Sequence, residues 1–189
     1  MANSEVSICN MALLRLGQSR ISSLTQSGLE AELSNVYYGA TLEELLTDYE
    51  WPFAIERRSL AASSSTNLTD FYYKYAIPSQ CLRILTFLDG DDFSEVTDEW
   101  FIEGAFVYAN RGPGYIKYIS NITNPALFTQ PFVEALALRI AIKMCIKMTQ
   151  DQSLMNMLYQ EYAVAMQSAM GLSGANSHAE PAATTLWSE

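Results

Sequence analysis

The chain has 189 residues, 49% of them hydrophobic, so it is long enough and apolar enough to bury a core. Its formal net charge of −10 argues against direct nucleic-acid binding, because phosphate recognition needs clustered lysine and arginine. The longest apolar run, Ala135 to Met148, is shorter than the roughly 20 residues that span a bilayer, and it carries basic residues. Composition therefore predicts a globular protein without a membrane span.

The N-terminus and the cysteines predict an intracellular, reducing setting. The opening sequence MANSEVSICN has neither a basic stretch nor an apolar stretch, so we expect no signal peptide. Cys9, Cys81 and Cys145 lie far apart, each within an apolar pattern, and no Cys or His spacing is typical of zinc. We expect buried free thiols.

Two helices are predicted in the first 50 residues. Ser4 is placed to cap the first helix, and Gly17 suits its C-terminal end. An S-x-x-E capping box at Ser27 opens a second helix of about 23 residues. That helix is expected to end near Glu50, because Pro52 disfavours helical geometry in the residue before it.

An aromatic cluster, YEWPF, follows the second helix directly. Trp51 and Phe53 are expected to pack back onto the helices, with Trp51 as a buried anchor rather than an exposed contact. Two interpretations of Arg57 and Arg58 stay open: they are solvated surface charges, or they pair with acidic residues of a neighbouring subunit. The serines that follow are interpreted as a hinge into the next part of the chain.

Between Phe71 and Ile122 the pattern changes to aromatic and β-branched runs separated by glycine-containing breaks. We expect three to five antiparallel strands in one small sheet. Glu103 and Gly104 are predicted to form the tight turn of a hairpin. The sequence NRGPG at residues 110–114 is predicted to be a turn between strands rather than a phosphate-binding loop, because the GxxxxGK[ST] pattern is missing.

Helical periodicity returns after Asn124. Pro131 fits the first position of a third helix, and Asp151 or Ser153 is expected to cap a fourth, which Gly171 ends.

Together these elements predict an α+β protein that is mainly α. The expected core is a four-helix bundle made from residues 1–58 and 126–171. Residues 59–125 form a small antiparallel β insertion between helices two and three. Residues 172–189 are small and polar until Leu186, and are expected to be a C-terminal tail that is flexible or ordered by a partner.

No constellation of residues in the sequence supports catalysis. His178 stands in the tail with no acid or nucleophile near it in sequence. The acidic stretch at residues 89–99 lacks the order of an EF-hand calcium loop. We therefore expect a protein that is not an enzyme and that has no catalytic site, cofactor or metal ion.

Partner contacts are the predicted role of the fourth helix and the tail. The apolar residues of this helix form two neighbouring lines, and a bundle core needs only one, so the surplus can face another subunit. A segment ending in leucine and tryptophan can order on binding, although an unremarkable terminus is the open alternative. The residues predicted to contact a partner are Met155, Tyr159, Tyr162, Met166, Leu186 and Trp187.

Five segments in a fixed order carry a resemblance to a known family. They are MALLRLGQSRISSLTQ, YEWPFAIERRSLA, FYYKYAIPSQCLRIL, LFTQPFVEALALRIAIKMCIKMT and LYQEYAVAMQSAM, spread over most of residues 5–170. In this order the chain resembles the head-to-tail adaptor (connector) proteins of tailed bacteriophages, in particular those similar to tail tubular protein A of short-tailed phages.

The resemblance implies a structural virion protein without a catalytic site. Such adaptors form a ring, commonly of twelve subunits, beneath the portal protein, where they continue the DNA channel and give tail proteins a docking surface. It implies location at the head–tail junction of the virion, synthesis in the host bacterial cytoplasm, no sequence-specific DNA binding and no membrane. The alternatives are another tail ring component, such as a completion or terminator protein, and a small intracellular ligand-binding module whose sheet holds an aromatic pocket.

Overall fold

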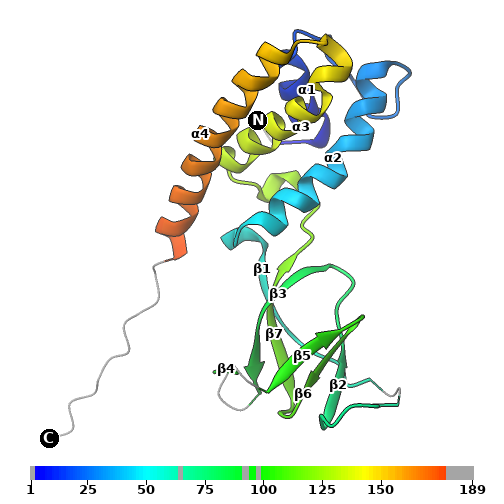
Figure 1. Ribbon diagram of the computed structural model, residues 1–189, viewed down its shortest axis with the longest axis vertical. Helices are drawn as coiled ribbons and strands as arrows, with labels where there is room; N and C mark the ends of the chain where they lie inside the picture. Colours follow the sequence, from blue (N-terminus) through cyan, green and yellow to red (C-terminus); the bar gives the residue numbers. More distant parts are fainter. Residues whose placement is uncertain (1–2, 64–65, 91–93, 97–98, 178–189) are drawn as a thin grey trace, which may run out of the picture. The chain divides into compact units, whose positions relative to one another are not determined.

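The computed structural model has four α-helices and two antiparallel β-sheets among the residues it describes, which are 3–63, 66–90, 94–96 and 99–177 (Figure 1). The chain divides into two compact units. The helical unit comprises Met1–Leu42 and Asn124–Glu189, and the β unit comprises Glu43–Thr123. The predicted α+β class is confirmed, whereas a four-helix bundle with one small inserted sheet is not, because the sheets are sizeable.

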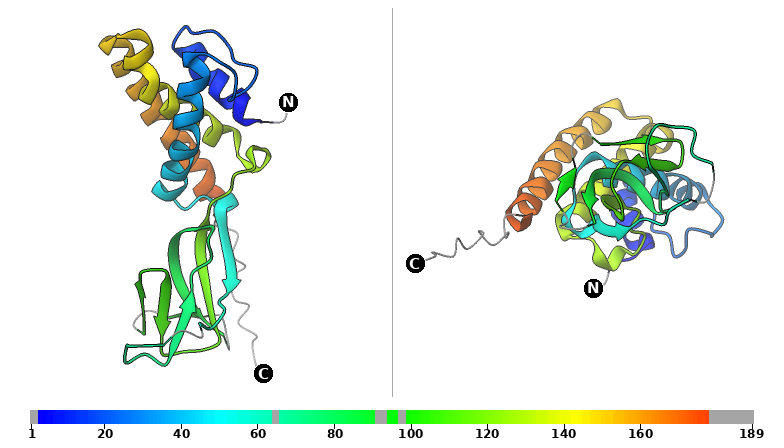
Figure 2. Two further views of the ribbon diagram at one scale, coloured as in Figure 1. Left: turned by 90° about the vertical axis from the view of Figure 1, so that its right-hand side faces the viewer. Right: turned by 90° about the horizontal axis from the view of Figure 1, so that it is seen from below.

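Helix α3 is the centre of the helical unit. It packs against α1 on one side and α4 on the other (Figures 1 and 2). Apolar side chains around most of α3 are buried, as a helix covered on several sides requires. The helices are α1 (Glu5–Arg15), α2 (Leu29–Asp48), α3 (Gln130–Thr149) and α4 (Gln152–Ser177).

Three helix ends follow the local signals of the sequence, whereas α2 begins at Leu29 after Gly28 (φ +134°), so Ser27 is not its N-cap as predicted. Ser4 and Ser7 form a reciprocal capping box at the start of α1, with N–H to hydroxyl distances of 2.8 and 3.1 Å. Gly17 has φ +67° just after that helix, as predicted for a C-terminal glycine. At α4, the Asp151 carboxylate accepts the backbone N–H of Ser153 at 2.8 Å, so Asp151 is the cap.

The end of α4 differs from the prediction. The helix continues past Gly171 to Ser177, so the first part of the predicted tail, 172–189, is helical. A glycine inside a helix costs only about 1 kcal/mol, and Ser173 beyond it is 5% exposed, so packing there outweighs the local signal. Residues 178–189, with Leu186 and Trp187, lie outside the described part of the chain.

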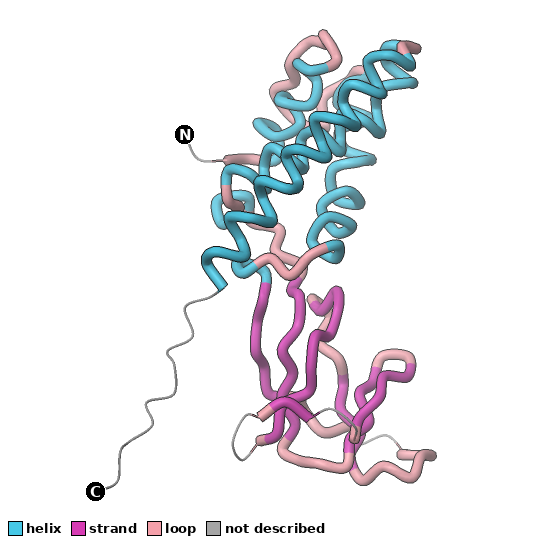
Figure 3. Tube along the Cα trace, turned by 60° about the vertical axis from the view of Figure 1, so that its left-hand side comes forward, coloured by secondary structure: helices cyan, strands magenta, loops and turns pink. Residues whose placement is uncertain are grey.

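The β unit contains two antiparallel sheets, and all the described strands belong to it (Figure 3). The four-stranded sheet has the order β1 (Ile55–Ser59), β7 (Gly114–Ser120), β3 (Cys81–Asp89), β4 (Glu95–Val96). The three-stranded sheet has the order β2 (Tyr73–Ala76), β6 (Phe106–Ala109), β5 (Trp100–Glu103). One apolar cluster draws on both sheets, including Tyr75 and Val107 from the second and Phe87, Ile116 and Tyr118 from the first.

The prediction of one sheet with three to five strands was therefore wrong. Strand β1 has a single apolar residue, Ile55, and carries Arg57 and Arg58 exposed on an edge strand. Strand β4 has only two residues. Such strands leave no alternating pattern for sequence reasoning to find. The hairpin was predicted correctly: β5 pairs with β6, and Gly104 in the turn has φ +60°.

Trp51 is fully buried, which confirms the predicted anchor. Its indole N–H donates to the carbonyl of Leu45 at 2.7 Å, and its ring lies 5.0 Å from that of Tyr49 and 6.1 Å from that of Phe53. The chain after α2 is thereby fixed to the last turns of that helix.

The β unit begins within α2, at Glu43, whereas the prediction placed this boundary after residue 58. Contacts made by the end of α2 explain the difference. The Asn121 amide donates to the Glu43 carboxylate at 2.9 Å, and Arg83 lies 4.0 Å from the carboxylate of Glu50. The other boundary falls at Thr123, and the prediction placed it after residue 125. Among the described residues, no helix combines the length and the hydropathy needed to cross a bilayer.

Candidate protein-interaction site

The four residues predicted as partner contacts on α4 do not share one environment. Met166 is 8% exposed and Met155 is half-buried, so these side chains pack within the chain. Tyr162 is half-buried against α3, where its hydroxyl accepts a hydrogen bond from Arg139 at 3.2 Å. Tyr159, 52% exposed, is the most accessible of the four. Partner binding stays a prediction for Tyr159, whereas burial assigns Met166 to the core.

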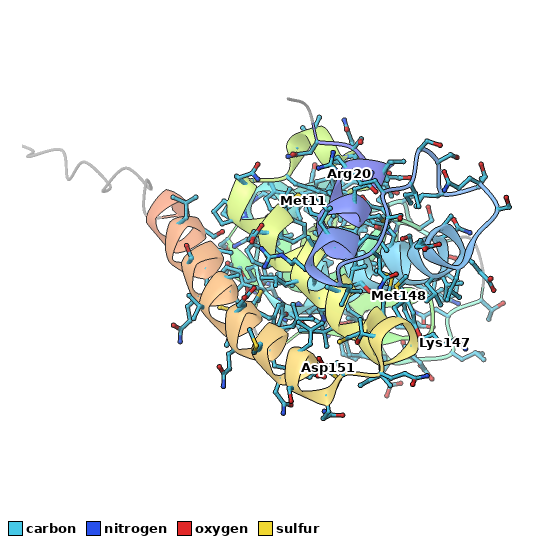
Figure 4. All side chains as sticks on the ribbon, turned by 90° about the horizontal axis from the view of Figure 1, so that it is seen from above. Met11, Arg20, Lys147, Met148 and Asp151 are labelled. Atoms are coloured by element: carbon cyan, nitrogen blue, oxygen red, sulfur yellow. The ribbon has the colours of Figure 1, made fainter. Side chains whose placement is uncertain are left out.

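Three other accessible apolar residues of α4 lie on a different side of the helix from Tyr159. Met157, Val164 and Leu172 are 57%, 68% and 46% exposed. Their spacing of seven and eight residues places them along one side of the helix. We call these three residues the α4 stripe. Helix α4 lies at the edge of the helical unit, with side chains directed away from it (Figure 4).

A shallow groove between α3 and α4 adjoins the α4 stripe. Its volume is about 450 Å³, within the range typical of ligand pockets. Val164 and Ala165 from α4 and Leu138 from α3 supply its apolar lining, and Glu134 and Glu161 place carboxylates on it. We call this the α3–α4 groove. It combines apolar side chains with hydrogen-bond acceptors, a composition suited to an amphipathic side chain.

Arg15 of α1 holds the two carboxylates of this groove. Its guanidinium pairs with Glu134 of α3 and, at 2.5 Å, with Glu161 of α4. All three side chains are partly exposed, so solvent screening limits the stabilisation to about 0.2–1 kcal/mol for a pair. The cluster joins three helices beside the groove and fixes the positions of its acceptors.

Burial affects the thiols of Cys9 and Cys81. Cys9 is fully buried, and burial raises the pKa of its thiol to about 12. Burial also raises the pKa of Cys81, which is less deeply buried. A raised pKa disfavours the nucleophilic thiolate. Within the described ranges no three His, Cys, Asp or Glu side chains are grouped so that they could hold a metal ion.

Two depressions flank the connection from Ile77 to Gln80 in the β unit. One has a volume of about 430 Å³ and is lined in part by Arg58 and Leu60. The other has a volume of about 500 Å³ and is lined in part by Arg83. Neither is lined by an aromatic side chain. The large aromatic residues of the sheets lie instead in the core cluster, so these depressions do not form the aromatic pocket considered from the sequence.

Sequence reasoning missed the α4 stripe. It followed the residues that repeat along the core side of the fourth helix, among them Leu158 and Ala169, which are buried. Met157 and Val164 stand next to that series in sequence but repeat with their own spacing of seven. Counting a second heptad-spaced apolar series would have found them. Leu138 on α3 could not be assigned to the groove without the packing of α3 on α4.

A comparison of the chain with protein-family models gave no match, and a comparison with curated proteins gave none either.

Proposed function

We propose that this chain is a structural virion subunit of a tailed bacteriophage, which assembles into a head-to-tail adaptor ring between portal and tail proteins. The ring continues the channel through which DNA passes. Twelve copies are expected from the family resemblance. Another ring component of the tail, such as a completion or terminator protein, is the alternative within the same class.

The observation that carries this proposal is the α4 stripe. A ring needs two different complementary faces on each subunit, and an apolar helix side left in solvent suits one of them. Met157, Val164 and Leu172 supply such a side on the longest helix of the described residues. The order of the five sequence segments supports the particular family.

The net charge of −10 supports the channel role. A negative wall repels the phosphate backbone, so DNA moves past it without being held.

Reconstitution with the portal and tail proteins of the same virus tests the proposal. Mixed at equal subunit ratio, the chain is expected to form rings on the portal that electron microscopy resolves. Met157→Glu is expected to abolish ring formation, because it places a charge on the α4 stripe. Asn156→Glu is the matched control, since Asn156 is exposed on another side of α4. A chain that stays monomeric with the portal would overturn the proposal.

A further inference from the structure

A second exposed apolar side lies on α2, in the part of that helix that belongs to the helical unit. Leu29 and Val36 are 43% and 61% exposed, and their spacing of seven residues puts them on one side of the helix. Gly39 and Ala40, three and four residues after Val36, are exposed beside it. We call these four residues the α2 face.

Gly39 leaves room for another helix on the α2 face. A Cβ added at Gly39 would meet no other atom within 4 Å, so packing within the chain does not require a glycine at this position. A glycine inside a helix costs about 1 kcal/mol relative to alanine. Its missing side chain lets a neighbouring helix approach α2 closely, because the distance between packed helices depends on the side chains at the contact.

The helices that carry the α2 face and the α4 stripe lie on opposite flanks of the helical unit. Residues 29–42 of α2 are on one flank and α4 is on the other, with α1 and α3 between them (Figures 1 and 4). A subunit of a closed ring contacts two neighbours through two different faces. The α4 stripe supplies one such face, and the α2 face is placed to supply the other.

The two sides match in spacing and in length. Leu29 and Val36 are seven residues apart, as are Met157 and Val164, and this is the spacing at which the side chains of two packed helices interlock. Each side extends about 20 Å along its helix. One can therefore cover the other along its full length.

Charge favours a contact of the α2 face with α4 over a contact with a second α2. Helix α2 has five acidic residues and no lysine or arginine, so two α2 helices would bring carboxylates together, and like charges at an interface are costly. Gln160 and Gln167 of α4 are exposed beside Val164 and carry no charge. Their amides can donate to the carboxylate of Glu32, which is exposed one turn before Val36.

We propose that the α2 face of one copy packs against the α4 stripe of the next copy, so that the ring closes through a helix pair with unlike partners. This contact rests on the proposed ring. A contact about 20 Å long and about 10 Å wide buries about 400 Å² over the two helices. A stable interface buries about 1,200 Å² or more, so the helix pair holds neighbouring copies where the portal aligns them and does not join two free copies.

Cysteine pairs introduced into the full-length chain test this contact in rings formed on the portal. Val36→Cys is combined in turn with Met157→Cys, Val164→Cys and Leu172→Cys, which sample the offset between the two helices along their axes. A disulfide needs Cα atoms within about 7 Å. After oxidation, at least one pair is expected to give a ladder of covalent multimers in non-reducing electrophoresis, because each copy links to two neighbours. All four positions are exposed, so the substitutions should preserve the fold.

Asn35→Cys combined with Ala163→Cys is the matched control. Both residues are exposed, and each lies about 100° around its helix from Val36 or Val164. This pair is expected to give no ladder, and neither is the unmodified chain with its three native cysteines.

The outcomes separate this contact from the proposed function. Rings seen on the portal by electron microscopy that none of the three pairs links would overturn the contact and leave the proposed function standing. A covalent dimer from Val36→Cys alone or from Val164→Cys alone would also overturn the contact, because like sides would then meet. An unmodified chain that forms no ring on the portal would overturn the proposed function, and this contact with it.

Discussion

The two units of this protein place their large apolar side chains differently. In the β unit, Phe87 and Tyr118 are fully buried in a cluster drawn from two sheets. In the helical unit, α3 is covered on several sides, yet α4 leaves the α4 stripe in solvent. The exposed apolar residues of the β unit include Leu68 and Tyr72, which lie in a connection rather than along one side of a helix.

This difference shows that apolar content by itself does not locate an interaction surface. A sheet has two faces, and a second sheet packed on one of them buries alternate residues. A helix at the edge of a unit buries only part of its circumference, so a second apolar series remains outside. The helical unit is therefore the better place to look for a partner contact.

The largest expected effects come from a matched pair of phenylalanines in the two cores. Phe87 in the β unit and Phe132 in the helical unit are both fully buried. Replacing either with alanine is expected to cost about 3–5 kcal/mol, through lost transfer free energy and the cavity left behind. Hydrogen exchange is expected to accelerate mainly in the unit that carries the substitution, because each unit has its own core.

Hydrogen exchange followed by mass spectrometry measures this effect segment by segment. Tyr72→Ala is the control, because Tyr72 is 82% exposed and its loss is expected to change stability by less than about 0.5 kcal/mol. Equal acceleration in both units for either phenylalanine variant would contradict the division into two cores.

A pair of glycines is expected to respond with opposite signs. In Gly114→Ala the added Cβ would lie 2.8 Å from ring atoms of Phe87 and Tyr75, and this overpacking is expected to destabilise the β unit by about 1–3 kcal/mol. Gly39 lies in α2, and a methyl group added there would meet no other atom within 4 Å, so Gly39→Ala is expected to stabilise by about 0.5–1 kcal/mol. Urea unfolding measures both variants. A Gly114→Ala variant at least as stable as the unmodified chain would refute the packing described for Gly114, and a destabilised Gly39→Ala variant would refute the open space described for Gly39.

The smallest expected effect concerns the ion pairs of Arg15. Arg15→Met removes both pairs and is expected to lower the unfolding free energy by about 0.2–1 kcal/mol for each pair, because the partners are partly exposed. The loss is expected to shrink at high salt, where screening weakens the pairs in the unmodified chain. Arg20→Met is the control: Arg20 is exposed, and the ion pairs found among the described residues do not include it (Figure 4). A loss that is the same at low and high salt would point to packing rather than charge.

Much of the helical unit could be predicted because its signals are local. The cap at Ser4, the glycine at the end of the first helix (Gly17) and the cap at Asp151 depend on neighbouring residues, and the structure has each of them. The turn at Gly104 was also predicted from a local signal, the glycine between two strand-like segments. Trp51 was predicted correctly because a proline directly after an aromatic residue limits where the chain can go.

The split into two sheets could not be predicted in the same way. Strand β1 pairs with β7, some sixty residues away, and Ile55 is its single apolar residue. Whether such a segment becomes a strand depends on a partner that is distant in sequence. The candidate site was only partly predictable for the same reason. The sequence pointed to α4 as a surface helix with surplus apolar residues, but it chose Met166, which is buried.

The sequence by itself determined where the first and fourth helices are capped, that residues 135–148 are strongly apolar, and that the chain is strongly acidic. These properties depend on side-chain chemistry and on spacings within one element. Only the tertiary structure decided which side of α4 faces α3, and therefore that Val164 rather than Met166 stands in solvent. Neighbouring apolar series on one helix are equivalent until another helix covers one of them.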